Sequence, residues 1–401
     1  MDKIQRGGIV LSPGTSEDLE EFKKERKSRN VPVKRSNAAI AASFLVLLLL
    51  WFGSLAFFVV PTVGKPDLAY FATECSKKFA AFIAYLSGDT AAYSVSNIVR
   101  YTVIVLSGAA LASAGVVFQG SFKNIIASPT TMGVQSGASL GNSLYLLLFT
   151  SVIEGTVIIE HDNQSYYEQS FFEQNLQQIF AMIGSFIAII AVVFITYSLG
   201  KGRFSSANIL FGGMIFSAFT GAVTNVIQYY FLFSDVDNTR LSALRVFSMG
   251  SFDRVLTVRH LACMSALLLP CLIALMLLSP KLNILVMGEE EARTMGINVR
   301  TLKVIIVAVG TLMSSVIFAF CGSIGFVGFI VPQIARRIVG PDFKKLISMT
   351  MALGGILMIL VYDIALYMGF SAYLNMIVSV IGCIMMIGSF LKKEGSSYDY
   401  E

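Results

Sequence analysis

The chain has 401 residues, of which 55% are hydrophobic and only 14% are charged. A soluble domain carries about 25% charged residues, so this composition excludes an ordinary water-covered surface and predicts an all-α membrane protein. The formal net charge is +5, but Lys and Arg are scattered between apolar runs instead of gathered on one face, which argues against nucleic-acid binding.

Residues 1–37 are polar and contain basic clusters at 23–29 and 34–35. A secretory signal would have a shorter apolar core followed by a cleavage site, whereas the apolar run from Ala38 is long enough to remain in the membrane. We therefore expect a cytoplasmic N-terminal tail that leads into a first membrane span.

Ten apolar stretches follow, and a membrane span needs about 20 apolar residues. They lie at 38–60, 98–117, 132–152, 178–199, 207–233, 259–278, 304–320, 325–334, 346–366 and 373–391. The eighth is short, and Gly322, Gly325 and Gly328 precede Pro332 in it, so a broken or tilted helix is expected there. We predict a ten-helix domain over residues 38–391, followed by a cytoplasmic tail at 392–401.

The distribution of basic residues predicts the orientation, because cytoplasmic links are enriched in Lys and Arg. The even-numbered links contain Lys123; Lys201 and Arg203; Lys281, Arg293 and Arg300; and Arg336, Arg337, Lys344 and Lys345. The link at 154–173, in contrast, contains five acidic residues and no Lys or Arg. Both termini are therefore predicted to be cytoplasmic.

The sequence contains no motif for catalysis, metal binding or ion coupling. Its five cysteines and two histidines are far apart, and it has no phosphate-binding loop and no nucleophile elbow. Asp363 is the one clear acid inside an apolar stretch, and we interpret it as a capping or interfacial carboxylate. We expect no catalytic residue, no bound metal and no cofactor on this chain, so that energy for uphill transport would come from a partner.

The first of three motifs is a helix dense in small residues, then a polar cytoplasmic turn stopped by Pro129, then a glycine-rich return helix. Small side chains let helices approach closely in lipid. The candidate positions for helix packing, gating or the pathway are Gly108, Gly115, Gln119, Asn124, Pro129 and Gly137.

The second motif lies at 287–299, inside the longest cytoplasmic link (280–303), and predicts a short charged helix broken at Gly296. Its candidate residues for contact with a partner are Gly288, Glu289, Glu290, Ala292, Arg293 and Gly296. The third motif, at 325–342, contains three further candidates for packing or gating: Gly328, Pro332 and Arg336.

In this order and spacing, the three motifs resemble the ferric-siderophore, haem and cobalamin permease family (FecCD type) of ATP-binding-cassette (ABC) importers. The resemblance covers residues 95–391 and implies a cobalamin-permease-like fold in the cytoplasmic membrane of a bacterium. It implies as partners a second permease subunit, identical or related, two cytoplasmic ABC ATPase subunits that use ATP and Mg²⁺, and an extracytoplasmic binding protein. It also implies that 288–299 forms the coupling helices that dock on the ATPase, and that 208–233 lines the pathway.

Some positions depart from the family pattern. Arg100 matches one of two arginines that help to dock the binding protein, but the position of the other is Asn97, and a further family arginine is replaced by Tyr367. The turn after the first motif helix reads Asn124-Ile125-Ile126 where the family usually has Asn-Pro-Leu, and the third motif reads Pro332-Gln333 where the family has Pro-His. The tenth stretch opens with residues 373–376 as Tyr-Leu-Asn-Met where the family has Leu-Pro-Ile-Gly.

The predicted function is that of a non-catalytic permease subunit that imports an iron(III)-siderophore, haem or cobalamin. The alternative is an ATP-independent secondary transporter or channel for a small solute. A structural or sensory membrane protein has no supporting feature in the sequence.

Overall fold

A computed structural model describes residues 5–6, 9–10, 33–57, 95–149, 171–199, 206–233, 238–252, 257–368 and 374–391. Most of the expected N-terminal tail, most of the acidic link (154–170) and the C-terminal tail (392–401) lie outside the described residues. Within them the fold is helical, apart from two two-residue strands, β1 (Gln5–Arg6) and β2 (Ile9–Val10), which pair antiparallel.

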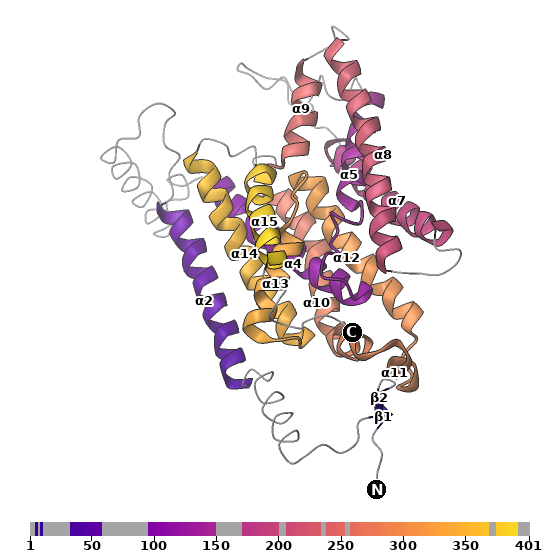
Figure 1. Cartoon of the computed structure of the whole chain (residues 1–401). Coiled ribbons are helices and arrows are strands. Elements are labelled where there is room, and N and C mark those ends of the chain that lie inside the picture. The colour runs from indigo at the N-terminus through magenta and orange to yellow at the C-terminus, as the bar shows by residue number, and fades with distance from the viewer. Residues whose placement is uncertain are drawn as a thin grey trace.

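Figure 1 shows the helices as one bundle with the short helix α11 at one end. In chain order they are α2 (Val33–Phe57), α4 (Val95–Phe122), α5 (Val134–Leu148), α7 (Phe171–Leu199), α8 (Ser206–Phe233), α9 (Asn238–Met249), α10 (Val258–Met287), α11 (Glu289–Thr294), α12 (Val299–Cys321), α13 (Val327–Val339), α14 (Phe343–Tyr367) and α15 (Leu374–Leu391).

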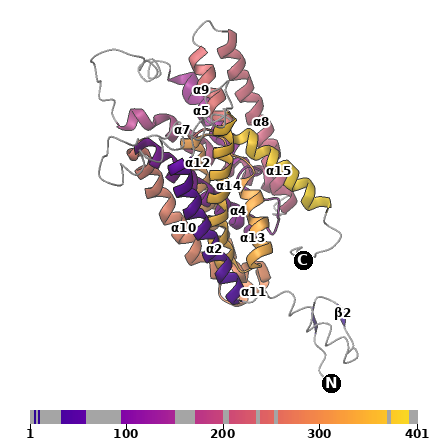
Figure 2. The same cartoon turned by 90° about the vertical axis from the view of Figure 1, so that its left-hand side faces the viewer.

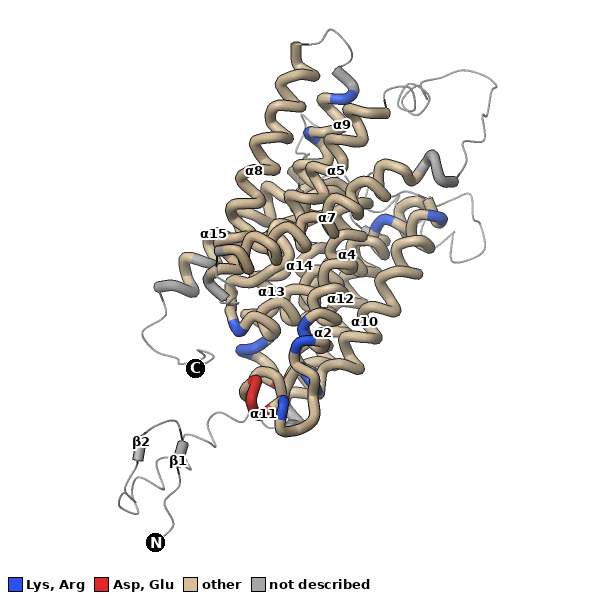
Figure 3. Tube along the Cα trace, turned by 90° about the vertical axis from the view of Figure 1, so that its right-hand side faces the viewer, with Lys and Arg blue, Asp and Glu red and all other residues tan. Residues whose placement is uncertain are grey.

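Seven of the described helices, namely α2, α4, α7, α8, α10, α12 and α14, are long and apolar enough to cross a membrane. The other three expected stretches correspond to the shorter helices α5, α13 and α15. Lys and Arg lie mainly towards the two ends of the bundle, with uncharged residues between them (Figure 3). This arrangement suits a bilayer, because charged side chains are costly in the hydrocarbon region.

Helix α4 is the centre of the bundle. Of the residues in its most apolar stretch 83% are buried, against 22% for the corresponding stretch of α2. Small residues make this possible, since they allow α10, α12, α13 and α14 to pack around it. The outer helices instead carry large exposed apolar side chains, such as Leu45 on α2, Phe194 on α7 and Leu277 on α10. Figure 2 shows α2 along the outside of the bundle, where it packs on α14. These outer faces suit contact with lipid.

The irregular backbone expected near the eighth apolar stretch is present, but it lies before the helix and not within it. Residues 322–326 separate α12 from α13, and Gly322 and Phe326 have φ angles of 76° and 61°. Helix α13 then continues through Pro332 to Val339. The interruption is buried, and its Gly325 N–H donates to Asn375 Oδ1 of α15 at 2.8 Å, which compensates for a lost helical hydrogen bond.

Asp363 does not cap a helix end, as one of the two predicted roles required: it lies one turn before the end of α14, and its side chain is buried between helices. It accepts hydrogen bonds from Ser54 Oγ of α2 at 2.5 Å and from the Tyr101 hydroxyl of α4 at 2.9 Å. The Tyr362 ring packs edge-on against Tyr101, with centroids 5.7 Å apart. The carboxylate therefore fastens α14 to two other helices.

Candidate functional site

The charged segment between α10 and α12 is built by local signals in its sequence. Helix α10 ends at Met287, and three glutamates follow in the first turn of α11, where negative charge stabilises the partial positive charge of a helix N-terminus. The segment turns at Gly296, whose φ of 78° suits glycine. Asn298 then caps α12, as its side chain accepts a hydrogen bond from Thr301 N at 3.1 Å. The predicted short charged helix, broken at Gly296, is thus present.

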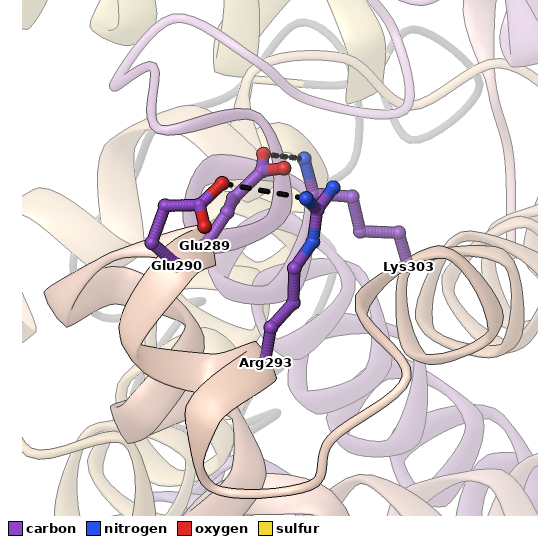
Figure 4. A network of polar contacts seen from close by, with 4 residues as sticks. All are labelled: Glu289, Glu290, Arg293 and Lys303. Atoms are coloured by element: carbon purple, nitrogen blue, oxygen red, sulfur yellow. Dashed lines mark hydrogen bonds and ion pairs between the residues drawn. The ribbon is translucent and has the colours of Figure 1, made fainter.

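Two ion pairs hold this segment (Figure 4). Lys303 Nζ of α12 donates to Glu289 Oε1 at 2.5 Å, and Arg293 Nη1 lies 3.3 Å from Glu290 Oε1 within α11. The pKa of Glu289 is lowered below its usual range, mainly by the hydrogen bond from Lys303. The positive charges of Lys303, Lys123 and Arg293 make smaller contributions in the same direction. Glu289 is therefore ionised at neutral pH.

A shallow groove of about 410 Å³ lies on the same segment. Arg293, Gly296, Ile297, Asn298, Val299 and Arg300 line it. Both arginines are exposed, and Arg293 is paired with Glu290, which lies outside the lining, whereas no ion pair of Arg300 is found in the described part of the chain. The groove therefore exposes the positive charge of Arg300 together with backbone groups at this end of the bundle.

Four of the candidate packing and gating residues meet where α4 crosses α13. A Cβ placed on Gly115 would lie 1.8 Å from the Gly328 carbonyl oxygen, so the two backbones touch. A Cβ on Gly328 would lie 3.4 Å from Pro129 Cδ, and the buried Gln119 Nε2 donates to Gly328 O at 3.4 Å. The structure thus brings Gly115, Gln119, Pro129 and Gly328 together.

The other candidates from the first motif pack elsewhere. Gly108 touches the backbone of Gly354 on α14, and Gly137 touches that of Gly184 on α7, since an added Cβ would lie 2.2 Å and 2.4 Å from the respective carbonyl oxygens. Asn124 is in the turn after α4, where its Oδ1 accepts a hydrogen bond from Ile126 N at 2.9 Å. These residues position helices and a turn, and they do not form one site.

The remaining candidates are Arg336, Pro332 and Arg100, and they lie on α13 and α4. Arg336 is in the last turn of α13 and Pro332 is buried in the middle of that helix. Arg100 is half-buried near the start of α4, and the 19 residues from there to Gln119 span about 28 Å of helix. The structure therefore separates Arg100 from both the charged segment at 288–299 and the Gly115–Gly328 contact.

Asn375, Gly382 and Phe326 lie near the start of α13 and were not among the predicted site residues. Asn375 binds the Gly325 backbone, and Gly382 of α15 leaves space for Phe326, whose Cδ1 would lie 2.5 Å from an added Cβ. Asn375 replaces an aliphatic residue of the family pattern, and this departure could have identified Asn375 from the sequence. No local sequence pattern, in contrast, marks Gly382 as the neighbour of Phe326. Among the described residues, no group of three His, Cys, Asp or Glu side chains gathers as metal ligands would.

Comparison with known proteins gives a consistent result. Residues 46–392 match the sequence model of the FecCD transport family. The hemin transport system permease protein HmuU of Yersinia pestis is 30% identical over 265 residues, which are 66% of this chain and 71% of that protein. The cobalamin import system permease protein BtuC of Halobacterium salinarum is 29% identical over 294 residues, covering 69% of this chain and 68% of that one.

A solved structure described as an inward-facing conformation of a metal-chelate type ABC transporter has the same fold. The TM-score is 0.66 over 89% of this chain and 99% of that chain, at 23% sequence identity. Fold and composition thus define the class, a multi-pass helical membrane protein. Within that class, the chain belongs to the FecCD transport family of ABC importer permeases.

Proposed function

We propose that this chain is the membrane-spanning permease subunit of an ABC importer that carries an iron(III)-siderophore, or alternatively haem or cobalamin, across the cytoplasmic membrane of a bacterium. The observation that carries the proposal is the α11 segment, a short charged helix on one end of an apolar bundle that has the fold of its family. Two relatives are named for hemin and cobalamin transport, which supports a metal chelate as cargo, and another is named for molybdate import.

In this proposal the chain binds no cofactor and catalyses no reaction. Two cytoplasmic ABC ATPase subunits use ATP and Mg²⁺, and their closure pushes on α11. The movement reaches the bundle through the contacts of α10 and α12 with α4. The close backbone contact of Gly115 with Gly328 supports a role of α4 and α13 in gating, because backbones in direct contact move as one unit.

The pathway itself would form between this chain and a second permease subunit, identical or related. Helix α8 is proposed to line it, which agrees with the exposed aromatic side chains Phe211, Phe219 and Tyr229 along that helix. An extracytoplasmic binding protein would deliver the cargo at the far end of the bundle from α11, with Arg100 as one docking residue.

The second candidate is a secondary transporter that uses no ATP, and buried Asp363 is the observation in its favour, since intramembrane carboxylates often carry protons or cations. The hydrogen bonds from Ser54 and Tyr101 give this carboxylate a structural role in joining helices, so it does not require ion coupling. The importer therefore remains the better-supported function.

Purification of the tagged chain from its native membranes separates the two candidates. The importer predicts that ABC ATPase subunits copurify and that the complex hydrolyses ATP. Isolation of the intact, folded chain without any ATPase subunit, in a mild detergent that preserves other ABC transporters of the same membranes, would contradict the importer.

A further inference from the structure

The two ion pairs of the coupling segment (residues 288–303) differ in their exposure to solvent. The Glu289 and Lys303 side chains are 42% and 32% exposed, whereas those of Glu290 and Arg293 are 84% and 61% exposed. Glu289 and Ala292 share one face of α11 because they are three residues apart, and Ala292 is fully buried. The face that carries Glu289 is therefore turned towards the bundle.

Glu289 is held there by charges from other elements. Lys303 is on α12, one turn beyond its start, and Lys123 follows the C-terminal end of α4. The hydrogen bond from Lys303 and the charges of both lysines favour the ionised carboxylate. Glu289 thus links α11 to α12 through Lys303, a partner inside this chain.

The other side of the segment is the groove lined by Arg293 and Arg300. Both guanidinium groups are exposed, and the groove opens over the N-terminus of the 23-residue helix α12, which adds a partial positive charge. Glu290 pairs with Arg293 at 3.3 Å, whereas no ion pair of Arg300 is found among the described residues, so Arg300 supplies the uncompensated positive charge of the groove. Arginine binds carboxylates through paired N–H donors, so this surface fits an acidic side chain.

We propose that the basic groove of Arg293 and Arg300 receives a carboxylate of the ATPase subunit, and that Glu289 is a positioning residue that holds this groove in place through Lys303. This inference rests on the proposed function and deepens it by naming the chemistry of the contact. Glu289 accordingly does not touch the ATPase.

A charge exchange within the chain tests the positioning role. The variants are Glu289→Lys, Lys303→Glu and the double variant that carries both changes, in the tagged chain expressed with its ATPase subunits. The measurements are the amount of permease in the membrane, the ATPase copurified per permease, and ATP hydrolysis by the complex. Each single variant places like charges together and is expected to lower copurified ATPase about tenfold, and the double variant is expected to restore it.

A second set tests the groove. Arg300→Glu is expected to lower copurified ATPase about tenfold at an unchanged amount of permease, because it places a carboxylate opposite a carboxylate. Lys344→Glu is the matched control, since it makes the same change of charge on an exposed residue at the start of α14, outside the groove. It is expected to leave the copurified ATPase unchanged.

The outcomes distinguish this inference from the proposed function. If the unaltered chain copurifies with no ATPase, the proposed function itself fails. If it does copurify, two results overturn the inference: a double variant as defective as Glu289→Lys, which would make Glu289 a direct ATPase contact, or normal copurification of Arg300→Glu.

Discussion

At the scale of single residues, the most informative group is the buried carboxylate of Asp363. A buried charged group is costly unless hydrogen bonds compensate for lost hydration, and Ser54 and Tyr101 supply two of them. The three side chains come from α14, α2 and α4, so this small polar cluster joins the outermost described helix to the central one.

The Asp363 cluster gives a prediction about stability. Tyr101→Phe removes one hydrogen bond to the carboxylate and is expected to cost about 1 kcal/mol of unfolding free energy, whereas Asp363→Leu leaves two buried hydroxyl donors without their acceptor and is expected to cost about 3 kcal/mol. Thermal unfolding of the purified variants in detergent measures the difference. Asp363→Asn, which retains one acceptor oxygen, should fall between them; an unchanged midpoint for Asp363→Leu would refute the structural role.

At the scale of helices, the bundle depends on direct backbone contact at glycine pairs. Gly108 with Gly354, Gly115 with Gly328, and Gly137 with Gly184 each leave no space for a side chain. In lipid the hydrophobic effect does not drive helices together, so close packing of this kind accounts for much of their association.

Gly115→Ala tests the contact between α4 and α13. The added methyl group would overlap the backbone of Gly328, so the helices must separate, and overpacking of this kind costs about 1–3 kcal/mol. Gly53→Ala on α2 is the matched control, because nothing lies within 4 Å of its added Cβ. Loss of thermal stability and of transport by Gly115→Ala, with Gly53→Ala unaffected, is expected; equal behaviour of the two variants would contradict close packing at this site.

The helices themselves were largely predictable from the sequence, because long apolar runs and local turn residues act over short distances. The short helix α11, the turn at Gly296 and the irregular segment before α13 all follow from such signals. The burial of Asp363 was not predictable, since it depends on Ser54 and Tyr101, which are distant in sequence. The pairing of Glu289 with a residue of the same chain was likewise not predictable, because it depends on where α12 places Lys303.

At the scale of the whole molecule, the arrangement separates two tasks. The apolar helices around α4 form the membrane-embedded body, and the charged groups gather towards its ends (Figure 3). The α11 segment joins α10 to α12, and both of these helices pack on α4. A movement of α11 would therefore reach the centre of the bundle through α10 and α12.

The most direct test of the importer is uptake by the purified permease–ATPase complex in proteoliposomes, supplied with its binding protein and with labelled ferric siderophore, haem or cobalamin. ATP and Mg²⁺ are provided on the side of the ATPase subunits, and a matched sample lacks ATP. We predict that at least one of these cargoes accumulates only when ATP is hydrolysed. Equal accumulation with and without ATP, or ATP hydrolysis that moves none of the three cargoes, would contradict the proposed function.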